Sequence, residues 1–276
     1  MSKKPKFGIC KLCGKYTVLT YEHVPPKAAF NNTPVKQISG NELIKSIGEN
    51  RRPWDLSNLK GTIQQRGKGG YYLCHSCNEN TGSWYVPYFV EFIRGIFYAI
   101  SSSGGLENET AIQLSAESIR PLPIFKEIMV MFCNINHNCF GDENLRSFLL
   151  DRESNDFDRQ KYRVFCYIAK GPILRMNGLS VACYTSPGQK TMMVTMTEIA
   201  ATPLGFALYI DLPAGYEPQG CEITLLSNYR YEETAKCEML LPVLESNIIF
   251  SGDYRTKEQI ESTIEQNEKN NKKTTF

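Results

Sequence analysis

The sequence predicts an α+β protein with two unequal parts. The first part carries two CxxC pairs and a strongly basic composition, whereas the longer second part contains short strand-like runs separated by Gly and Pro. A length of 276 residues with 42% hydrophobic residues is enough for two domains or for one domain with an appended module. We expect an N-terminal domain over residues 1–100, a strand-rich α+β domain over 106–253, and a charged tail over 254–276.

Helices are predicted where apolar residues recur with helical spacing. Residues 86–100 show this pattern, with Pro87 near the start and apolar residues at Phe89, Phe92 and Ile96. The run Ser-Ser-Ser-Gly-Gly over 101–105 breaks the pattern and is the best candidate for a linker. Residues 124–132 are typical of a buried helix or segment, and 144–150 of a second short helix. In the tail we expect a short helix around 258–265 that then frays.

The second part contains six strand-like runs, which favours an antiparallel sheet. They cover residues 162–169, 179–184, 192–197, 206–210, 222–226 and 239–244. Six further cysteines in this part lack CxxC spacing, and we interpret them as small core residues. They are Cys133, Cys139, Cys166, Cys183, Cys221 and Cys237. We find no catalytic pattern of residues there.

The two cysteine pairs of the first part are Cys10-Lys-Leu-Cys13 and Cys74-His-Ser-Cys77. Each pair can place two sulfurs on one metal from a tight turn, so the four thiolates predict a closed, structural zinc site. No signal-peptide core follows Met1 and no run of eighteen apolar residues occurs, so we expect a cytoplasmic chain outside the membrane. A reducing compartment makes disulfides or a redox CxxC pair the weaker alternatives.

Between the pairs lies the run Leu-Thr-Tyr-Glu-His-Val-Pro-Pro-Lys, which contains Glu22, His23 and Lys27, and Asn78 follows the last cysteine directly. This combination resembles the HNH endonuclease family, in its version with a zinc-knuckle scaffold. The resemblance covers about residues 8–85 and implies a ββα-metal fold, in which a β-hairpin and a helix surround one catalytic divalent cation. It does not extend to the remaining two thirds of the chain.

The resemblance implies a role for each residue of the motif. His23 takes the place of the general base, and Glu22 and Asn78 take the places of the metal ligands. One carboxylate, one amide oxygen and waters suit Mg²⁺ or Mn²⁺. The family also has an Asn that orients the base. Asn58, in the pair Asn58-Leu59, fits this pattern but lies sixteen residues before Cys74. Asn80 and His75 are the alternative contributors.

Charge points to a polyanionic partner for the first part. Residues 1–82 carry thirteen Lys and Arg against five Asp and Glu, whereas the rest of the chain carries eighteen against twenty-four. A positive field of this kind attracts phosphate groups. We expect DNA contacts from Lys27, Arg51, Arg52, Arg66 and Lys68.

The sequence therefore predicts a metal-dependent DNA endonuclease. Two other classes stay open, a noncatalytic zinc-ribbon protein that binds nucleic acid and an assembly subunit whose zinc knuckle is purely structural. For the C-terminal domain the sequence leaves open target binding, ligand sensing, a homodimer contact or a protein partner.

Overall fold

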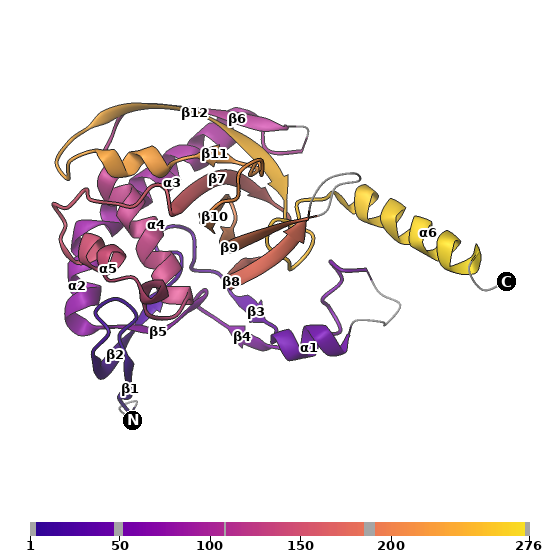
Figure 1. Ribbon diagram of the computed structural model, residues 1–276, viewed down its shortest axis with the longest axis horizontal. Coiled ribbons are helices and arrows are strands. Elements are labelled where there is room, and N and C mark those ends of the chain that lie inside the picture. Colours follow the sequence, from indigo (N-terminus) through magenta and orange to yellow (C-terminus); the bar gives the residue numbers. More distant parts are fainter. Residues whose placement is uncertain (1–3, 47–51, 108, 185–190, 274–276) are drawn as a thin grey trace.

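The computed structural model describes residues 4–46, 52–107, 109–184 and 191–273, which form three β-sheets and the helices around them (Figure 1). The sheets have the strand orders β1-β2-β5, β3-β4 and β6-β12-β7-β10-β9-β8, with β11 paired to β7 beside the third. All strand pairs are antiparallel except β12 with β7. The chain is therefore a mixed α/β fold with one large sheet, as the sequence predicts in outline.

The first sheet and one helix make a strand–strand–helix unit. Strands β1 (Lys6–Ile9) and β2 (Tyr16–His23) form a hairpin, and β2 also pairs with β5 (Gly69–Cys74). Helix α2 (His75–Trp84) starts at the residue after β5. The long connection between β2 and β5 holds β3 (Val35–Gln37), α1 (Gly40–Lys45) and β4 (Thr62–Gln64).

Three further helices cover this unit and the large sheet. Helix α3 (Val86–Ser102) is amphipathic and buries Phe89, Phe92 and Ile96. Helix α4 (Pro121–Ile135) is buried along almost its whole length, which explains why its sequence is apolar on all sides. It packs against α2, α3, α5 (Glu143–Leu150) and two strands of the large sheet.

The large sheet contains most of the second part of the chain. Its strands are β6 (Ala111–Ile119), β7 (Tyr162–Lys170), β8 (Arg175–Tyr184), β9 (Met192–Ala201), β10 (Leu204–Ile210), β11 (Cys221–Glu222) and β12 (Ala235–Glu245). Short 3-10 helices, η1 (Asn138–Gly141) and η2 (Thr224–Asn228), lie in the connections. The last helix, α6 (Lys257–Lys273), extends away from the rest of the molecule (Figure 1).

One hydrophobic cluster runs through both parts of the chain, from Cys10 to Leu241. Hydrogen bonds also cross between the parts. Tyr85 Oη donates to the carbonyl of Leu149 at 2.9 Å, and Arg146 Nε donates to the carbonyl of Leu12 at 3.0 Å. The boundaries predicted at residues 100 and 106 stay a prediction, but the two parts share a core.

Most elements predicted from the sequence are confirmed within a few residues at each end. The helices over 86–100, 124–132 and 144–150 correspond to α3, α4 and α5. Five of the six predicted strands correspond to β7, β8, β9, β10 and β12. The strand predicted over 222–226 is wrong, because only Cys221 and Glu222 pair with β7 before the chain turns into η2.

Three other expectations need correction. Residues 101 and 102 belong to the end of α3, so the expected linker is partly helical. Helix α6 continues to Lys273 rather than fraying after 265. Of the six cysteines expected in the core, Cys183 is exposed and Cys221 is half-buried, whereas the other four are buried. Among the described residues, no helix is long and apolar enough to cross a bilayer.

Candidate functional site

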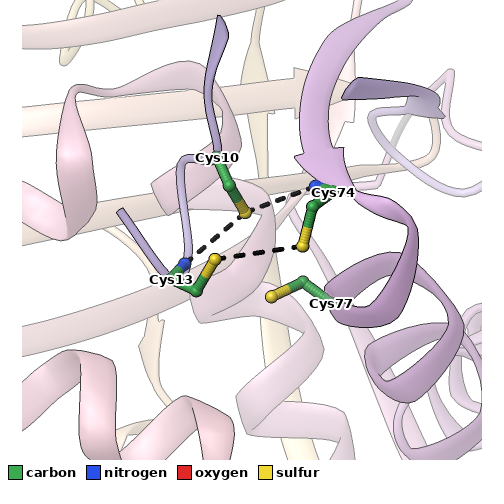
Figure 2. A group of neighbouring side chains, drawn as sticks. All are labelled: Cys10, Cys13, Cys74 and Cys77. Carbon is green, nitrogen blue, oxygen red and sulfur yellow. Dashed lines mark hydrogen bonds between the residues drawn. The ribbon is translucent and has the colours of Figure 1, made fainter. Parts of the chain in front are cut away.

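The four predicted cysteines come together although sixty residues lie between the two pairs. Their sulfur atoms all lie within 4.8 Å of one another, and Cys13 Sγ is 3.9 Å from Cys74 Sγ (Figure 2). A tetrahedron of Zn–S bonds of about 2.3 Å separates its sulfurs by about 3.8 Å. The four side chains therefore fit a metal ion such as zinc.

Backbone N–H groups already favour a thiolate in this cluster. The amides of Cys13 and Cys74 donate to Cys10 Sγ at 3.5 and 3.3 Å (Figure 2). A hydrogen bond with the Cys77 thiol, together with these amides, lowers the pKa of Cys10 to about 4, although burial opposes the shift. Burial raises the pKa of Cys13. Four thiols this close together cannot all ionise, because the thiolates would repel one another. A bound divalent cation would offset that repulsion.

The cysteine cluster fixes the start of α2. Cys10 and Cys13 flank the turn between β1 and β2, whereas Cys74 is the N-cap of α2 and Cys77 lies in its first turn. The sequence of α2 includes Thr81, Gly82 and two Asn residues, which are poor helix formers. Tertiary contacts and the cysteine cluster therefore hold this helix, and they place Asn78 beneath β2.

Asn78 and Glu22 meet between the helix and the sheet. Asn78 Nδ2 donates to Thr20 Oγ1 at 2.9 Å, and Thr20 Oγ1 donates to the carbonyl of Leu73 at 2.9 Å. Burial raises the pKa of Glu22 to about 7, while a hydrogen bond from the Asn78 side chain acts in the opposite direction. The structure thus brings together the two residues predicted as ligands of the catalytic cation.

His23 is the last residue of β2 and lies on the other side of the strand from Glu22. Its ring packs edge-on against Tyr21, two residues earlier, with the ring centres 5.2 Å apart. His23 Nε2 lies 3.0 Å from the carbonyl oxygen of Arg66. A carbonyl oxygen only accepts, so Nε2 carries a proton, and in the neutral form of the ring the lone pair is on Nδ1.

Two glycines lie opposite this pair of residues. His23 pairs with Gly69 and Glu22 pairs with Gly70 across the ladder. A Cβ at Gly69 would collide with the carbonyl oxygen of Glu22, so the close approach of the two strands requires glycine there. Gly69 and Gly70 are therefore part of the sheet, at the start of β5.

The buried side chain of Asn31 holds the loop that contains Arg66. Asn31 Oδ1 accepts from the amide of Lys68 at 2.7 Å, and Asn31 Nδ2 donates to the carbonyls of Lys68 and Pro25 at 2.7 and 2.6 Å. Gly67 has φ +88° and packs against the Asn31 backbone. These contacts fix the carbonyl that binds His23.

The structure does not bring Asn58 to the site. Asn58 is exposed, and within the described part of the chain its side chain makes no hydrogen bond to His23. The described contact of His23 Nε2 is with the Arg66 carbonyl instead. The alternatives His75 and Asn80 lie exposed on α2, where His75 faces Glu79 at 3.6 Å.

The predicted DNA-binding residues have different environments. Lys27 and Arg66 are exposed, whereas Lys68 is half-buried and burial lowers its pKa. Arg52 Nε pairs with Glu261 of α6 at 3.1 Å. Arg51 lies outside the described residues.

Sequence reasoning missed Thr20, Asn31 and the Arg66 carbonyl. Thr20 precedes Glu22 by two residues, so strand alternation could have placed it on the same side. Asn31 and a backbone carbonyl carry no sequence signal of their own.

Comparison with protein-family models, with curated proteins and with solved structures gave no match. The likeness to HNH endonucleases therefore rests on the motif and is a prediction.

Proposed function

We propose that the chain is a metal-dependent HNH-type endonuclease that hydrolyses phosphodiester bonds in DNA, with His23 as the general base. The observation that carries the proposal is the hydrogen bond between His23 Nε2 and the Arg66 carbonyl, next to the Glu22–Asn78 contact. A base needs a free lone pair on a fixed ring, and Nδ1 of His23 meets both conditions. Glu22 and Asn78 would supply oxygen atoms for a cation on the other side of the end of β2.

In this proposal each residue has a separate task. His23 Nδ1 accepts a proton from the attacking water, and the Arg66 carbonyl stabilises the imidazolium through Nε2–H. Glu22 and Asn78 would hold Mg²⁺ or Mn²⁺, and the bound cation would neutralise charge on the phosphate and help the leaving oxygen. The side chains of Glu22 and His23 point to opposite sides of β2. A phosphate bound at the end of this strand would therefore lie between the cation site on one side and the imidazole on the other.

The basic first part of the chain supports DNA as the substrate. Exposed Lys27 follows β2 by four residues, and exposed Arg66 lies in the loop that binds His23. Lys27 is close to the proposed base in sequence, and the Arg66 backbone contacts it in space, so both residues could contact phosphates that flank the cleaved bond. Zinc held by the four cysteines would be structural, because all four of its coordination positions would be filled.

The proposal is tested by nicking of supercoiled plasmid by the full chain loaded with zinc. We expect open-circular product with added Mg²⁺ or Mn²⁺ and none when these cations are omitted. Intact plasmid under every cation condition, with protein that contains zinc and is folded, would contradict it.

One observation favours a second candidate function, nucleic-acid binding without cleavage. The rings of Phe7 and Tyr16 stack on each other on the β1–β2 hairpin and are 60% and 74% exposed. Exposed aromatic rings in a basic region can stack on unpaired bases. A salt-dependent gel shift without nicking would favour this function, and no binding to any nucleic acid would favour an assembly subunit.

A further inference from the structure

Helix α4 contains a buried acid, Glu127, that lacks a full set of hydrogen-bonding partners among the described residues. Glu127 is 4% exposed, and its Oε2 atom has no hydrogen-bond partner. No ion pair to Glu127 occurs among the described residues. An ionised carboxylate that is buried without a partner lowers the free energy of unfolding by roughly several kcal/mol relative to a paired one. Such a group is therefore rare unless it has a role.

The position of Glu127 links it to the Glu22–Asn78 site. Helix α4 packs against α2, the helix that carries Asn78. Burial and, to a smaller extent, the charge of Glu22 raise the pKa of Glu127 to about 8. The packing of α4 on α2 and this charge effect place Glu127 and Glu22 in one region, although they come from different parts of the chain.

Two neighbouring carboxylates in a desolvated region disfavour ionisation of both, and a divalent cation reverses that preference. Lys126 does not neutralise the pair, because its ammonium group donates to the carbonyls of Phe148 and Asp151 at 2.8 and 2.6 Å. Among the described residues, the arrangement thus consists of two acids and an amide, and no ion pair to a basic side chain neutralises either acid.

We propose that Glu127 supplies a second carboxylate to the divalent-cation site of Glu22 and Asn78, either to the cation itself or to a water bound to it. This inference rests on the cation site of the proposed function, but it concerns binding and not cleavage. It gives the second part of the chain a direct contribution to the site. The oxygen-rich donor set would select Mg²⁺ or Mn²⁺ over softer cations.

The test is a titration of the zinc-loaded full chain with Mn²⁺, in which the electron paramagnetic resonance signal measures the concentration of free Mn²⁺. We expect one Mn²⁺ per chain in the parent and about 10–100-fold weaker binding in Glu127→Gln, the usual effect of losing a residue that supports a metal site. Glu79→Gln is the matched control, because it removes the same charge from an exposed residue next to Asn78.

Thermal unfolding gives a second readout. Mn²⁺ should raise the midpoint of the parent and of Glu79→Gln, because a ligand of the folded state stabilises it, and should have little effect on Glu127→Gln. Zinc content and circular dichroism establish that each variant is folded. Glu127→Asp keeps the charge, shortens the side chain by one methylene and should also weaken Mn²⁺ binding.

A folded Glu127 variant that binds Mn²⁺ as tightly as the parent would overturn the inference, as would a parent that binds no Mn²⁺. The outcome is separable from that of the nuclease proposal. Mn²⁺ binding that depends on Glu127, in a protein that does not nick DNA, would support the inference and contradict the proposed function. If the parent nicks DNA and the Glu127→Gln variant binds Mn²⁺ as tightly as the parent, the proposed function is supported and the inference about Glu127 is contradicted.

Discussion

Cys10 is the residue around which the knuckle is organised, because its sulfur accepts two backbone N–H groups and lies among three other thiols. A zinc ion there would tie the β1–β2 turn to the start of α2. The CxxC spacing was enough to predict this cluster, since the same short turn recurs wherever two such pairs share a metal. By contrast, nothing in the sequence indicated which carbonyl would bind His23.

Replacing one ligand tests the cluster at the scale of a residue. Cys74→Ser should release zinc and destabilise the fold. A loss of unfolding free energy on the order of 5 kcal/mol would lower the midpoint of thermal unfolding by about 10–20 °C in a chain of this size. Metal analysis and thermal unfolding measure both effects. Cys183→Ser is the control, since Cys183 is exposed and outside the cluster. Full zinc content in Cys74→Ser would argue against a zinc site at these cysteines.

Glu22 gives a pH dependence of stability in protein without added Mg²⁺ or Mn²⁺. Its pKa is raised by burial from 4.5 to about 7 in the folded chain. The stability that it contributes is therefore complete below pH 4.5 and is lost as the pH rises through 7. Glu22→Gln should remove a slope of at most about 1.4 kcal/mol per pH unit from the free energy of unfolding. Urea unfolding between pH 4 and 8 measures it, and identical slopes in both proteins would contradict the burial of this carboxyl.

At the scale of elements, the long regular patterns were predictable and the short irregular ones were not. Helix α3 carries its apolar residues on one face, so its existence and its start were clear from the sequence, whereas its end lies two residues beyond the predicted one. The run 222–226 was predicted as a strand from its composition, but the chain forms η2 there and Thr224 Oγ1 accepts from the amide of Val164 at 2.9 Å. A side-chain contact of this kind overrides strand propensity.

Helix α5 offers a test of one capping residue. Asp142 accepts from the amides of Asn144 and Leu145 at 3.0 and 3.1 Å, and from Lys161 Nζ at 2.6 Å. Burial alone would raise the pKa of Asp142, but these bonds and one from Tyr162 outweigh it and lower the pKa to about 2.

Asp142→Ala should cost about 1–2 kcal/mol of unfolding free energy, the usual effect of losing an N-cap. The folded pKa is depressed, so the contribution of the charge is present above the ordinary value of 3.8 and is lost as the pH falls toward 2. Asp142→Asn keeps a capping oxygen and should lose this acid sensitivity. Denaturant unfolding at pH 7 and at pH 3 measures both changes. An equal decline of the parent and Asp142→Asn at pH 3 would show that the charge contributes nothing.

At the scale of the whole molecule, the uneven charge predicts where a polyanion binds. DNA binding should weaken with salt, and each phosphate contact should add about 0.9 to the slope of log affinity against log salt concentration. Changing four basic residues to Gln should flatten that slope and weaken binding to all sequences alike. The residues are Arg51, Arg52, Arg66 and Lys68.

A matched variant removes four basic side chains from the second part of the chain. It changes Arg152, Arg159, Lys236 and Lys269 to Gln. These residues are exposed and lie beyond the basic first part. The control should bind DNA with the parent slope in filter-binding titrations. If both quadruple variants lose binding equally, net charge and not a basic site governs the interaction.

The shared core was less predictable than the elements that form it. Helix α4 could be recognised as buried, but its contacts with α2 and with the large sheet depend on the tertiary fold and leave no local pattern. For the same reason Glu127, which lies between Lys126 and Ile128, gave no signal in the sequence. Prediction from the motif therefore stopped at the boundary of the first part.

The central claim is that His23 is a general base, and substitution of this residue tests it most directly. His23→Ala is compared with His75→Ala in the plasmid-nicking assay with Mg²⁺ or Mn²⁺. His75 is the control because its imidazole is exposed on α2. Loss of the base should slow nicking by about 10²–10⁴-fold, with zinc content and unfolding midpoint close to those of the parent. His75→Ala should cut at the parent rate. Nicking by folded, zinc-loaded His23→Ala at the parent rate would contradict the mechanism.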